Sequence, residues 1–198
     1  MPNAESSRKP SILIGVTGSV DAMLVPAYIR AIRAGLECSI SVILTPDAMN
    51  FVNVDSLSLI VERVICGESP KDWSTDRPGL IAAAHDLMIV LPTTANTLAA
   101  AAAGTSMNRL TMMFLVGNFP IVFFPVMGPA MWDRPVVQRN VVTIRDDGHE
   151  VIEPAWKDQY EPHYQRMYGH YTLPEPEDVL AVIRRKLDAE AVRIEAAQ

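Results

Sequence analysis

Two segments decide the fold of this chain: Leu87-Met-Ile-Val-Leu-Pro-Thr-Thr-Ala-Asn-Thr97 and Ile121-Val-Phe-Phe-Pro-Val-Met-Gly-Pro-Ala-Met-Trp132. Each begins with a short apolar run, over residues 87–91 and 121–124, and continues into a loop that opens with proline. Such a run predicts a buried strand, and the loop that follows predicts the start of a helix. In open α/β sheets ligands bind at these loops, because helix N-termini there offer unpaired N–H groups.

Strand and helix patterns alternate outward from these segments. Gly35 is expected to close the first helix in the left-handed conformation, and Thr45, before Pro46, is expected to cap another helix. The alternation predicts a Rossmann-like, flavodoxin-like doubly wound parallel sheet in three α/β/α layers. We expect one domain over residues 11–198, after a disordered lead-in at 1–10. The expected strands are 11–16, 39–44, 87–91, 121–124 and 149–152, and the expected helices are 20–34, 55–65, 94–103, 134–146 and 177–196.

Residues 154–174 break this rhythm. Proline brackets the segment, and it holds four of the chain's five tyrosines. Tyr160, Tyr164 and Tyr168 recur every four residues, which fits a helical stripe packed on the core. The proline brackets and the amphipathic side chains favour the other interpretation, a mobile clamp that orders over a bound peptide.

Composition excludes several classes of protein. The net charge of −6 argues against nucleic acid as a partner, since proteins that bind it carry a basic face. No apolar run approaches the length of a membrane span, and no signal segment precedes the first strand. Two cysteines are too few for a disulfide framework or a structural zinc site, so we expect no metal and a cytoplasmic location. The apolar share of 49% suits an oligomer.

Three polar helix starts are expected at the same edge of the sheet. Thr17-Gly-Ser19 follows the first strand and offers hydroxyl and N–H groups to a phosphate. Thr45 opens a second start, where Asp47 would repel a phosphate that it faced. The Thr93–Thr97 segment carries more polar groups than a helix cap needs, which suits a ligand with several hydrogen-bonding edges.

These motifs give the chain a resemblance to the homo-oligomeric flavin-containing cysteine decarboxylases. The motifs are Ile-Gly-Val-Thr-Gly-Ser19, Thr-Pro…Asn-Phe51, Pro-Thr-Thr-Ala-Asn-Thr97 and Met-Trp-Asp-Arg-Pro-Val-Val-Gln-Arg-Asn140, in the family's order over roughly residues 11–153. Within the family the chain is most similar to peptidyl-cysteine decarboxylases, which oxidatively decarboxylate the C-terminal cysteine of ribosomally made lantibiotic, linaridin and thioamide-peptide precursors. The resemblance implies FMN, which the sequence does not distinguish from FAD, and a trimer or a dodecamer of four trimers.

The resemblance also implies site residues. A subunit boundary is expected near Met131, Trp132 and Asn140. The implied substrate contacts are Met127, Gly128, Tyr160, Tyr164, Tyr168 and Gly169. The implied cofactor contacts are Thr17, Gly18, Ser19, Thr45, Pro92, Thr93, Thr94, Ala95, Asn96, Thr97, Thr111, Met131 and Trp132.

The chain departs from the family at two positions that matter for the chemistry. Pro78 stands where the family carries its catalytic histidine, and Gly128 stands where the motif Pro-x-Met-Asn-x-x-Met-Trp has asparagine. The catalytic base is therefore unknown. Asp72 and Asp76 are candidates for it, and the N–H groups around Gly128 and Ala130 are candidates for holding the substrate carboxylate. We interpret His85 as structural.

Three alternatives stay open beside the peptide decarboxylase. A non-catalytic regulatory flavoprotein of the same superfamily accommodates both departures. A phosphopantothenoylcysteine decarboxylase is disfavoured, because such enzymes use a cysteine in a C-terminal loop and this chain has none after Cys66. A flavin prenyltransferase fits the fold, but the Met-Trp…Gln-Arg-Asn run does not suggest it.

Overall fold

The computed structural model describes residues 8–69, 71 and 76–196. In this part of the chain six parallel strands form one sheet in the order β3-β2-β1-β4-β5-β6, and β7 and β8 form a separate hairpin. The strands are β1 (Ser11–Val16), β2 (Ser39–Leu44), β3 (Arg63–Ile65), β4 (Leu87–Thr93), β5 (Ile121–Pro125), β6 (Glu150–Val151), β7 (Ala155–Glu161) and β8 (Arg166–Thr172). The doubly wound α/β prediction is confirmed, because the chain winds outward from β1 in one direction and from β4 in the other.

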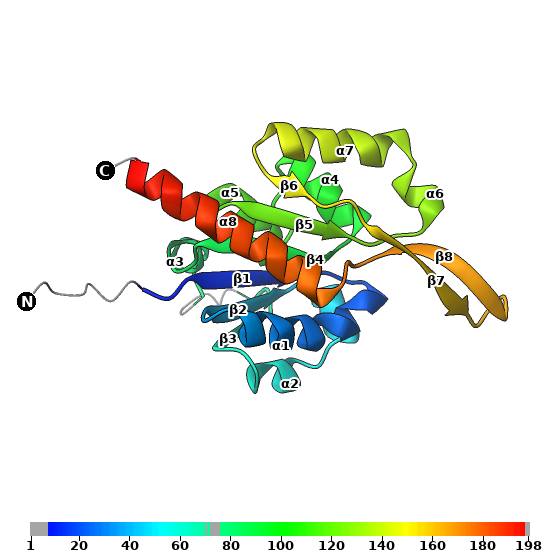
Figure 1. The fold of residues 1–198 in the computed structure, drawn as a ribbon, viewed down its shortest axis with the longest axis horizontal. Coiled ribbons are helices and arrows are strands. Elements are labelled where there is room, and N and C mark those ends of the chain that lie inside the picture. Colours follow the sequence, from blue (N-terminus) through cyan, green and yellow to red (C-terminus); the bar gives the residue numbers. More distant parts are fainter. Residues whose placement is uncertain (1–7, 70, 72–75, 197–198) are drawn as a thin grey trace, which may run out of the picture.

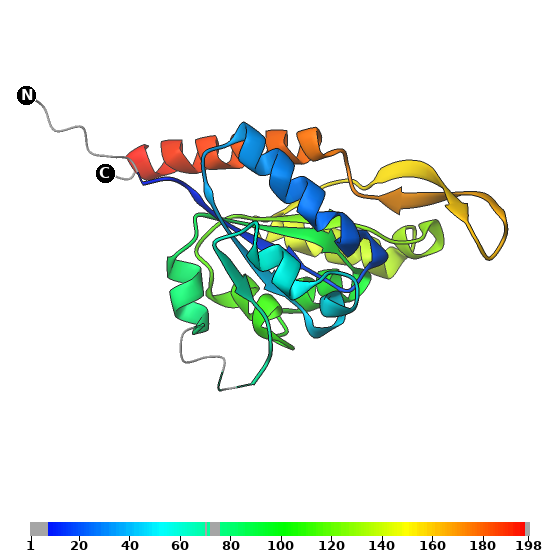
Figure 2. The same cartoon turned by 90° about the horizontal axis from the view of Figure 1, so that it is seen from below.

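Helices cover both faces of the sheet (Figures 1 and 2). Helices α1 and α8 pack in one apolar cluster with β1 and β2, and helices α4, α5 and α7 pack in a second cluster on the opposite face. None of the described helices is both long and apolar enough to span a bilayer. The helices are η1 (Val20–Leu24), α1 (Val25–Gly35), η2 (Pro46–Asn50), α2 (Val54–Ser58), α3 (Pro78–Ala83), α4 (Ala95–Ala103), α5 (Arg109–Val116), α6 (Pro129–Trp132), α7 (Pro135–Asp146) and α8 (Pro176–Ala196).

Local sequence explains most helix ends. The side chain of Thr94 caps α4, and Gly104 closes it with a φ of 62°. Asn108 and Thr111 form a capping box at the start of α5. Pro78 is the first residue of α3, a position that tolerates proline because its N–H would have no intrahelical partner. The residue in the histidine position therefore starts a helix.

Three predictions about elements are wrong. The expected helix 20–34 is a 3-10 turn followed by α1, and Gly35 is the last residue of α1 rather than a left-handed cap. A Cβ on Gly35 would lie 2.2 Å from a methyl carbon of Leu180, so glycine lets α8 pack closely. The expected helix 55–65 is the short α2 followed by the edge strand β3. The strand expected at 149–152 is present as the shorter β6, and the strands β7 and β8, which were not expected, follow it.

Residues 154–174 form a two-stranded ribbon that projects from the body of the sheet (Figures 1 and 2). The helical-stripe interpretation is therefore wrong. Cross-strand pairs share a face of a ribbon, so Tyr160, which pairs with Met167, lies on the face opposite to Tyr168, which pairs with Gln159. All three predicted tyrosines are exposed.

Candidate functional site

A cavity of about 420 Å³ lies at the carboxyl ends of β1, β2 and β4. It sits between β1 and β4, where the winding direction of the sheet reverses, and this is the place where doubly wound folds bind ligands. Its volume falls in the usual range for small-molecule sites, roughly 300–1,000 Å³. The lining residues are Thr17, Gly18, Thr45, Pro46, Asp47, Glu68, Thr94, Ala95, Asn96, Thr97, Met107, Asn108, Thr111 and Met131.

The hydroxyl of Thr17 joins the two central loops of this cavity. It donates to the carbonyl oxygen of Pro92 at 2.8 Å and accepts from the backbone N–H of Thr94 at 3.2 Å. Thr17 is buried, so these bonds fix the start of α4 relative to the end of β1. The loop that offers Thr94, Ala95 and Asn96 to the cavity is thereby held in place.

Gly18 also contributes to the shape of the cavity. A Cβ at Gly18 would lie 2.5 Å from the Cβ of Asp47, so only glycine lets the two loops approach this closely. Thr45 caps η2 by accepting from the N–H of Ala48 at 3.3 Å. Asp47 lines the cavity together with Thr45, although its carboxylate would repel a phosphate that it faced.

The donor set fits a flavin mononucleotide. Hydroxyls and the first-turn N–H groups of helices suit a phosphate, and the amide of Asn96 with the hydroxyls of Thr94 and Thr97 suits a ring that has hydrogen-bonding edges. The Thr94 and Thr97 hydroxyl oxygens lie 3.0 Å apart. Met131 and Met107 add apolar surface against which a flat ring can pack.

Most of the predicted cofactor residues meet at this cavity, and four do not. Ser19 caps η1, and the buried hydroxyl of Thr93 donates to the carbonyl of Val90 and accepts from the N–H of Phe124. Pro92 and Trp132 are also buried away from the cavity lining. Five lining residues are not among the predicted cofactor contacts: Pro46, Asp47, Glu68, Met107 and Asn108. For Asn108 a signal existed, because Asn-x-x-Thr before an apolar run is a capping pattern.

The second motif meets the hairpin. The N–H of Met127 donates to the carbonyl of Tyr171 on β8 at 3.2 Å. The Tyr171 ring lies between two tryptophans, with centroids 6.0 Å from Trp132 and 5.1 Å from Trp156. A Cβ on Gly169 would lie 2.0 Å from the Trp156 indole, which gives Gly169 a packing role of its own. The loop that carries Gly128 is thus joined to the ribbon.

Gly128 itself leaves space. An added Cβ would meet no heavy atom within 4 Å, and its φ of −63° and ψ of 150° suit any residue. Its carbonyl accepts from the N–H groups of Met131 and Trp132. Packing and backbone conformation therefore do not explain why glycine stands at this position.

The candidate base Asp76 is held away from the lining of the cavity. Its carboxylate pairs with the guanidinium of Arg63 and lies 3.7 Å from that of Arg109. Asp72, the other candidate, lies outside the described residues.

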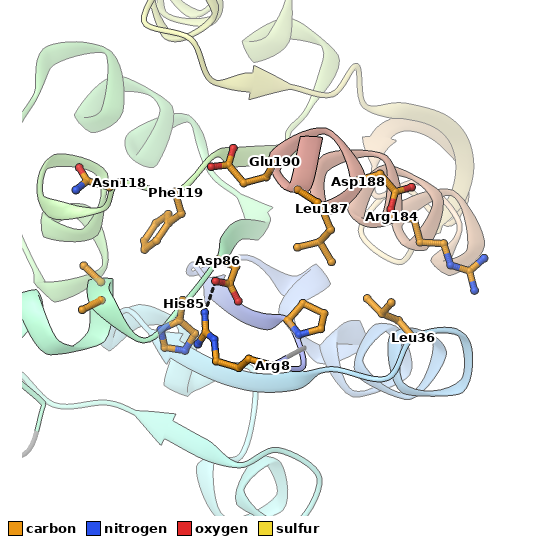
Figure 3. A pocket seen from close by; sticks show the side chains of 14 residues that line it. Arg8, Leu36, His85, Asp86, Asn118, Phe119, Arg184, Leu187, Asp188 and Glu190 are labelled. Atoms are coloured by element: carbon orange, nitrogen blue, oxygen red, sulfur yellow. Dashed lines mark hydrogen bonds and ion pairs between the residues drawn. The ribbon is translucent and has the colours of Figure 1, made fainter. Parts of the chain in front are cut away.

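A larger cavity, of about 560 Å³, lies at the other end of the sheet (Figure 3). Its residues Pro10, Asp86 and Phe119 precede β1, β4 and β5, so it is at the amino ends of the strands. His85 lies there, with Nδ1 2.7 Å from the carbonyl of Ile81. Burial lowers the pKa of His85, and the Ile81 carbonyl opposes that shift. His85 is not part of the carboxyl-end cavity, which accords with the structural interpretation.

Comparison with known proteins identifies the family. The family model Flavoprotein matches residues 1–188. The chain is 32% identical over 146 residues to mersacidin decarboxylase of Bacillus sp. strain HIL-Y85/54728, covering 73% of each. Bifunctional coenzyme A biosynthesis proteins, such as that of Mycobacterium bovis, also match, and the chain spans 34% of that protein's length.

Solved structures agree with the sequence relatives. A structure of a single-residue variant of EpiD complexed with the substrate peptide DSYTC superimposes with a TM-score of 0.79 at 27% identity, covering 88% of this chain and 98% of that one. The FMN-dependent cysteine decarboxylase SpaF gives a TM-score of 0.74 at 28% identity, covering 92% and 97%. The chain therefore belongs to the Flavoprotein family, and its close homologues are flavin-dependent peptidyl-cysteine decarboxylases.

Proposed function

We propose that this protein is an FMN-dependent peptidyl-cysteine decarboxylase, which converts the C-terminal cysteine of a ribosomally made precursor peptide into an enethiol. One observation carries the proposal. The Thr94–Thr97 segment and Met131 line the cavity where the sheet's winding reverses, and the loop before Met131 is bonded to an exposed aromatic ribbon. In the proposal the cavity is the cofactor site and the ribbon is the peptide-binding surface, and the two adjoin. The similarity to mersacidin decarboxylase and EpiD supports this substrate class.

The reaction removes CO2 and two hydrogen atoms from the cysteine. FMN, when bound, supplies a hydride acceptor for the cysteine Cβ. Loss of the thiol proton and of that hydride turns the side chain into a thioaldehyde, an electron sink β to the carboxylate. The C–CO2 bond then breaks readily, and a proton on sulfur completes the enethiol. The protein's task is to hold the Cβ and the carboxylate in position.

We assign the holding of the flavin to Thr17, Gly18, Thr45 and the Thr94–Thr97 segment, together with Thr111 and Met131, which also line the cavity. The two hydrogen bonds of the Thr17 hydroxyl fix the geometry of this surface independently of a bound ligand. The backbone N–H groups around Gly128 and Ala130 are assigned to the substrate carboxylate, where the family uses asparagine. We also propose that the protein is a homo-oligomer built on trimers, with a subunit boundary near Met131 and Asn140.

We propose that the ribbon binds the substrate peptide. Its face with Trp156, Tyr160 and Met167 continues to Tyr171, which contacts the loop that carries Gly128. The other face carries Tyr168. The ribbon is joined to the body at its base, where Thr172 donates to Asp21 at 3.0 Å and Tyr28 donates to the carbonyl of Pro174. A clamp that moves about this base brings the Tyr160 face over the peptide.

The two faces provide a matched pair of variants. Synthetic peptides that end in cysteine are incubated with the FMN-loaded protein, and products are followed by mass spectrometry. Tyr160→Ser is expected to raise the KM for the peptide about tenfold, because a buried aromatic contact contributes about 1.5 kcal/mol or more. Tyr168→Ser is expected to change KM less than threefold. Equal effects, or no effect of either change, would contradict the assigned face.

The alternatives make different predictions in the same assay. A regulatory flavoprotein would bind FMN and leave every peptide unchanged. A phosphopantothenoylcysteine decarboxylase would process that small substrate in preference to peptides, but the chain has no cysteine after Cys66 to perform its reductive step.

A further inference from the structure

Two acidic residues line the cavity, and neither is one of the candidates Asp72 and Asp76 that the sequence offered. Among the described lining residues Asp47 and Glu68 are the ones with acidic side chains, and no histidine, lysine or cysteine joins them. Among the described residues of this chain that line the cavity, these two therefore carry the side chains that can accept a thiol proton. Their positions within the cavity distinguish them.

Asp47 lies at the end built by Gly18 and Thr45. The Gly18 backbone and the Cβ of Asp47 are in close contact there, beside the hydroxyls that suit a phosphate. Glu68 lies with the start of α5, since its carboxylate accepts from the backbone N–H of Arg109 at 3.1 Å. Asn108 and Thr111, which form the capping box of α5, line the cavity beside it.

Arg109 fixes the loop that presents Glu68. Its side chain is 1% exposed and donates to the carbonyl oxygens of Cys66 and Gly67, the two residues before Glu68. Asp76 lies 3.7 Å from the same guanidinium and balances its buried charge. The side chain of Arg109 thus fixes the two residues before Glu68, and the backbone N–H of Arg109 binds the Glu68 carboxylate. Such preorganisation is what a catalytic group requires.

We propose that Glu68 is the general base of the reaction, replacing the histidine that Pro78 displaces. The inference rests on the proposed function. A carboxylate oxygen of Glu68 takes the proton of the substrate thiol; the S–H bond breaks, and its electron pair forms the C=S bond as hydride leaves the Cβ. After CO2 has left, the protonated Glu68 returns its proton to the sulfur and gives the enethiol. Glu68 is then ready for the next turnover.

The test compares Glu68→Gln with Asp55→Asn, which alters an exposed carboxylate on α2 away from the cavity. At pH 7 the Glu68→Gln protein should lose about 10²–10⁴-fold in kcat/KM, the usual contribution of a general base. It should bind FMN like the wild type, as measured by quenching of flavin fluorescence. Its deficit should shrink at least tenfold by pH 9, because a thiol of pKa about 8.5 ionises there without help. Asp55→Asn should stay within about twofold of the wild type.

A second variant separates chemistry from structure. Glu68→Ala leaves space for a small carboxylate, so added formate should raise its activity in proportion to concentration, whereas chloride at the same ionic strength should not. Activity of Glu68→Gln within threefold of the wild type at pH 7 would overturn the proposal. A deficit that neither alkaline pH nor formate relieves would overturn it as well. A wild-type protein that binds FMN and decarboxylates no cysteine peptide would refute the proposed function, and the base with it.

Discussion

Thr17→Val is the most direct test of how the cofactor cavity is built. Valine matches the shape of threonine but removes the hydroxyl that joins the Pro92 carbonyl to the Thr94 N–H. Both groups lose a partner, and a buried polar group without one costs about 1–3 kcal/mol. Because Thr94 is only half-buried, we expect the lower part of the summed range, about 2–4 kcal/mol of lost unfolding free energy.

The assay is urea unfolding followed by circular dichroism, with and without added FMN. The expected loss corresponds to a fall in Tm of about 4–16 °C for a chain of this length. FMN affinity should fall at least about tenfold, since the start of α4 is no longer fixed. Thr143→Val is the control, because Thr143 is exposed and bonds within α7, so its change should stay within about 0.5 kcal/mol. A Thr17→Val protein as stable as that control would refute the structural role of the hydroxyl.

Three further predictions concern the second motif, the ribbon and pH. Gly128→Asn restores the family motif in open space, so the fold should persist and KM for the peptide should fall about tenfold, as expected for one added hydrogen bond to a carboxylate; an unchanged KM would argue that the carboxylate lies elsewhere. Gly169→Ala should displace the Trp156 indole and lose about 1 kcal/mol of stability, seen in urea unfolding and near-UV circular dichroism, and wild-type behaviour would contradict the packing role of Gly169. Burial lowers the pKa of His85 below 6.5, so the unfolded chain binds the proton more readily than the folded chain. The contribution of neutral His85 to the free energy of unfolding is therefore present above pH 6.5 and is lost as the pH falls through the folded-state pKa. His85→Gln should therefore lose less stability than the wild type between pH 7.5 and 5.5, and parallel urea midpoints would contradict this.

The sheet could be predicted because its signals are local. The buried strands β1, β2, β4 and β5 are continuous apolar runs, and Thr45 and Thr94 cap the helices that follow two of them, as their positions indicated. The edge strand β3 was not predicted, because a strand of three residues is too short to show a clear pattern of apolar side chains. Its pairing with β2 is a tertiary contact, and the helical spacing of α2 runs into it without a break in the sequence.

The ribbon and the proposed base were harder to predict from the sequence, for a related reason. A spacing of four residues is a multiple of two, so Tyr160, Tyr164 and Tyr168 fit a helix and a strand equally well. The bond between Arg109 and Glu68 spans 41 positions, and no local pattern announces such a contact. Asp76 looked like a free loop carboxylate in the sequence, whereas the fold pairs it with two arginines.

In the proposed reaction one cavity binds the flavin, and the bound flavin oxidises a peptide cysteine there. The most direct measurement mixes the FMN-loaded protein, without oxygen, with one equivalent of a peptide that ends in cysteine, and records flavin absorbance and peptide mass together. We expect the visible band of oxidised flavin to bleach as the peptide loses CO2 and two hydrogen atoms, one for one, whereas the same peptide ending in serine should leave the flavin band and the peptide mass unchanged. A flavin that stays oxidised beside an intact cysteine peptide would contradict the proposed reaction.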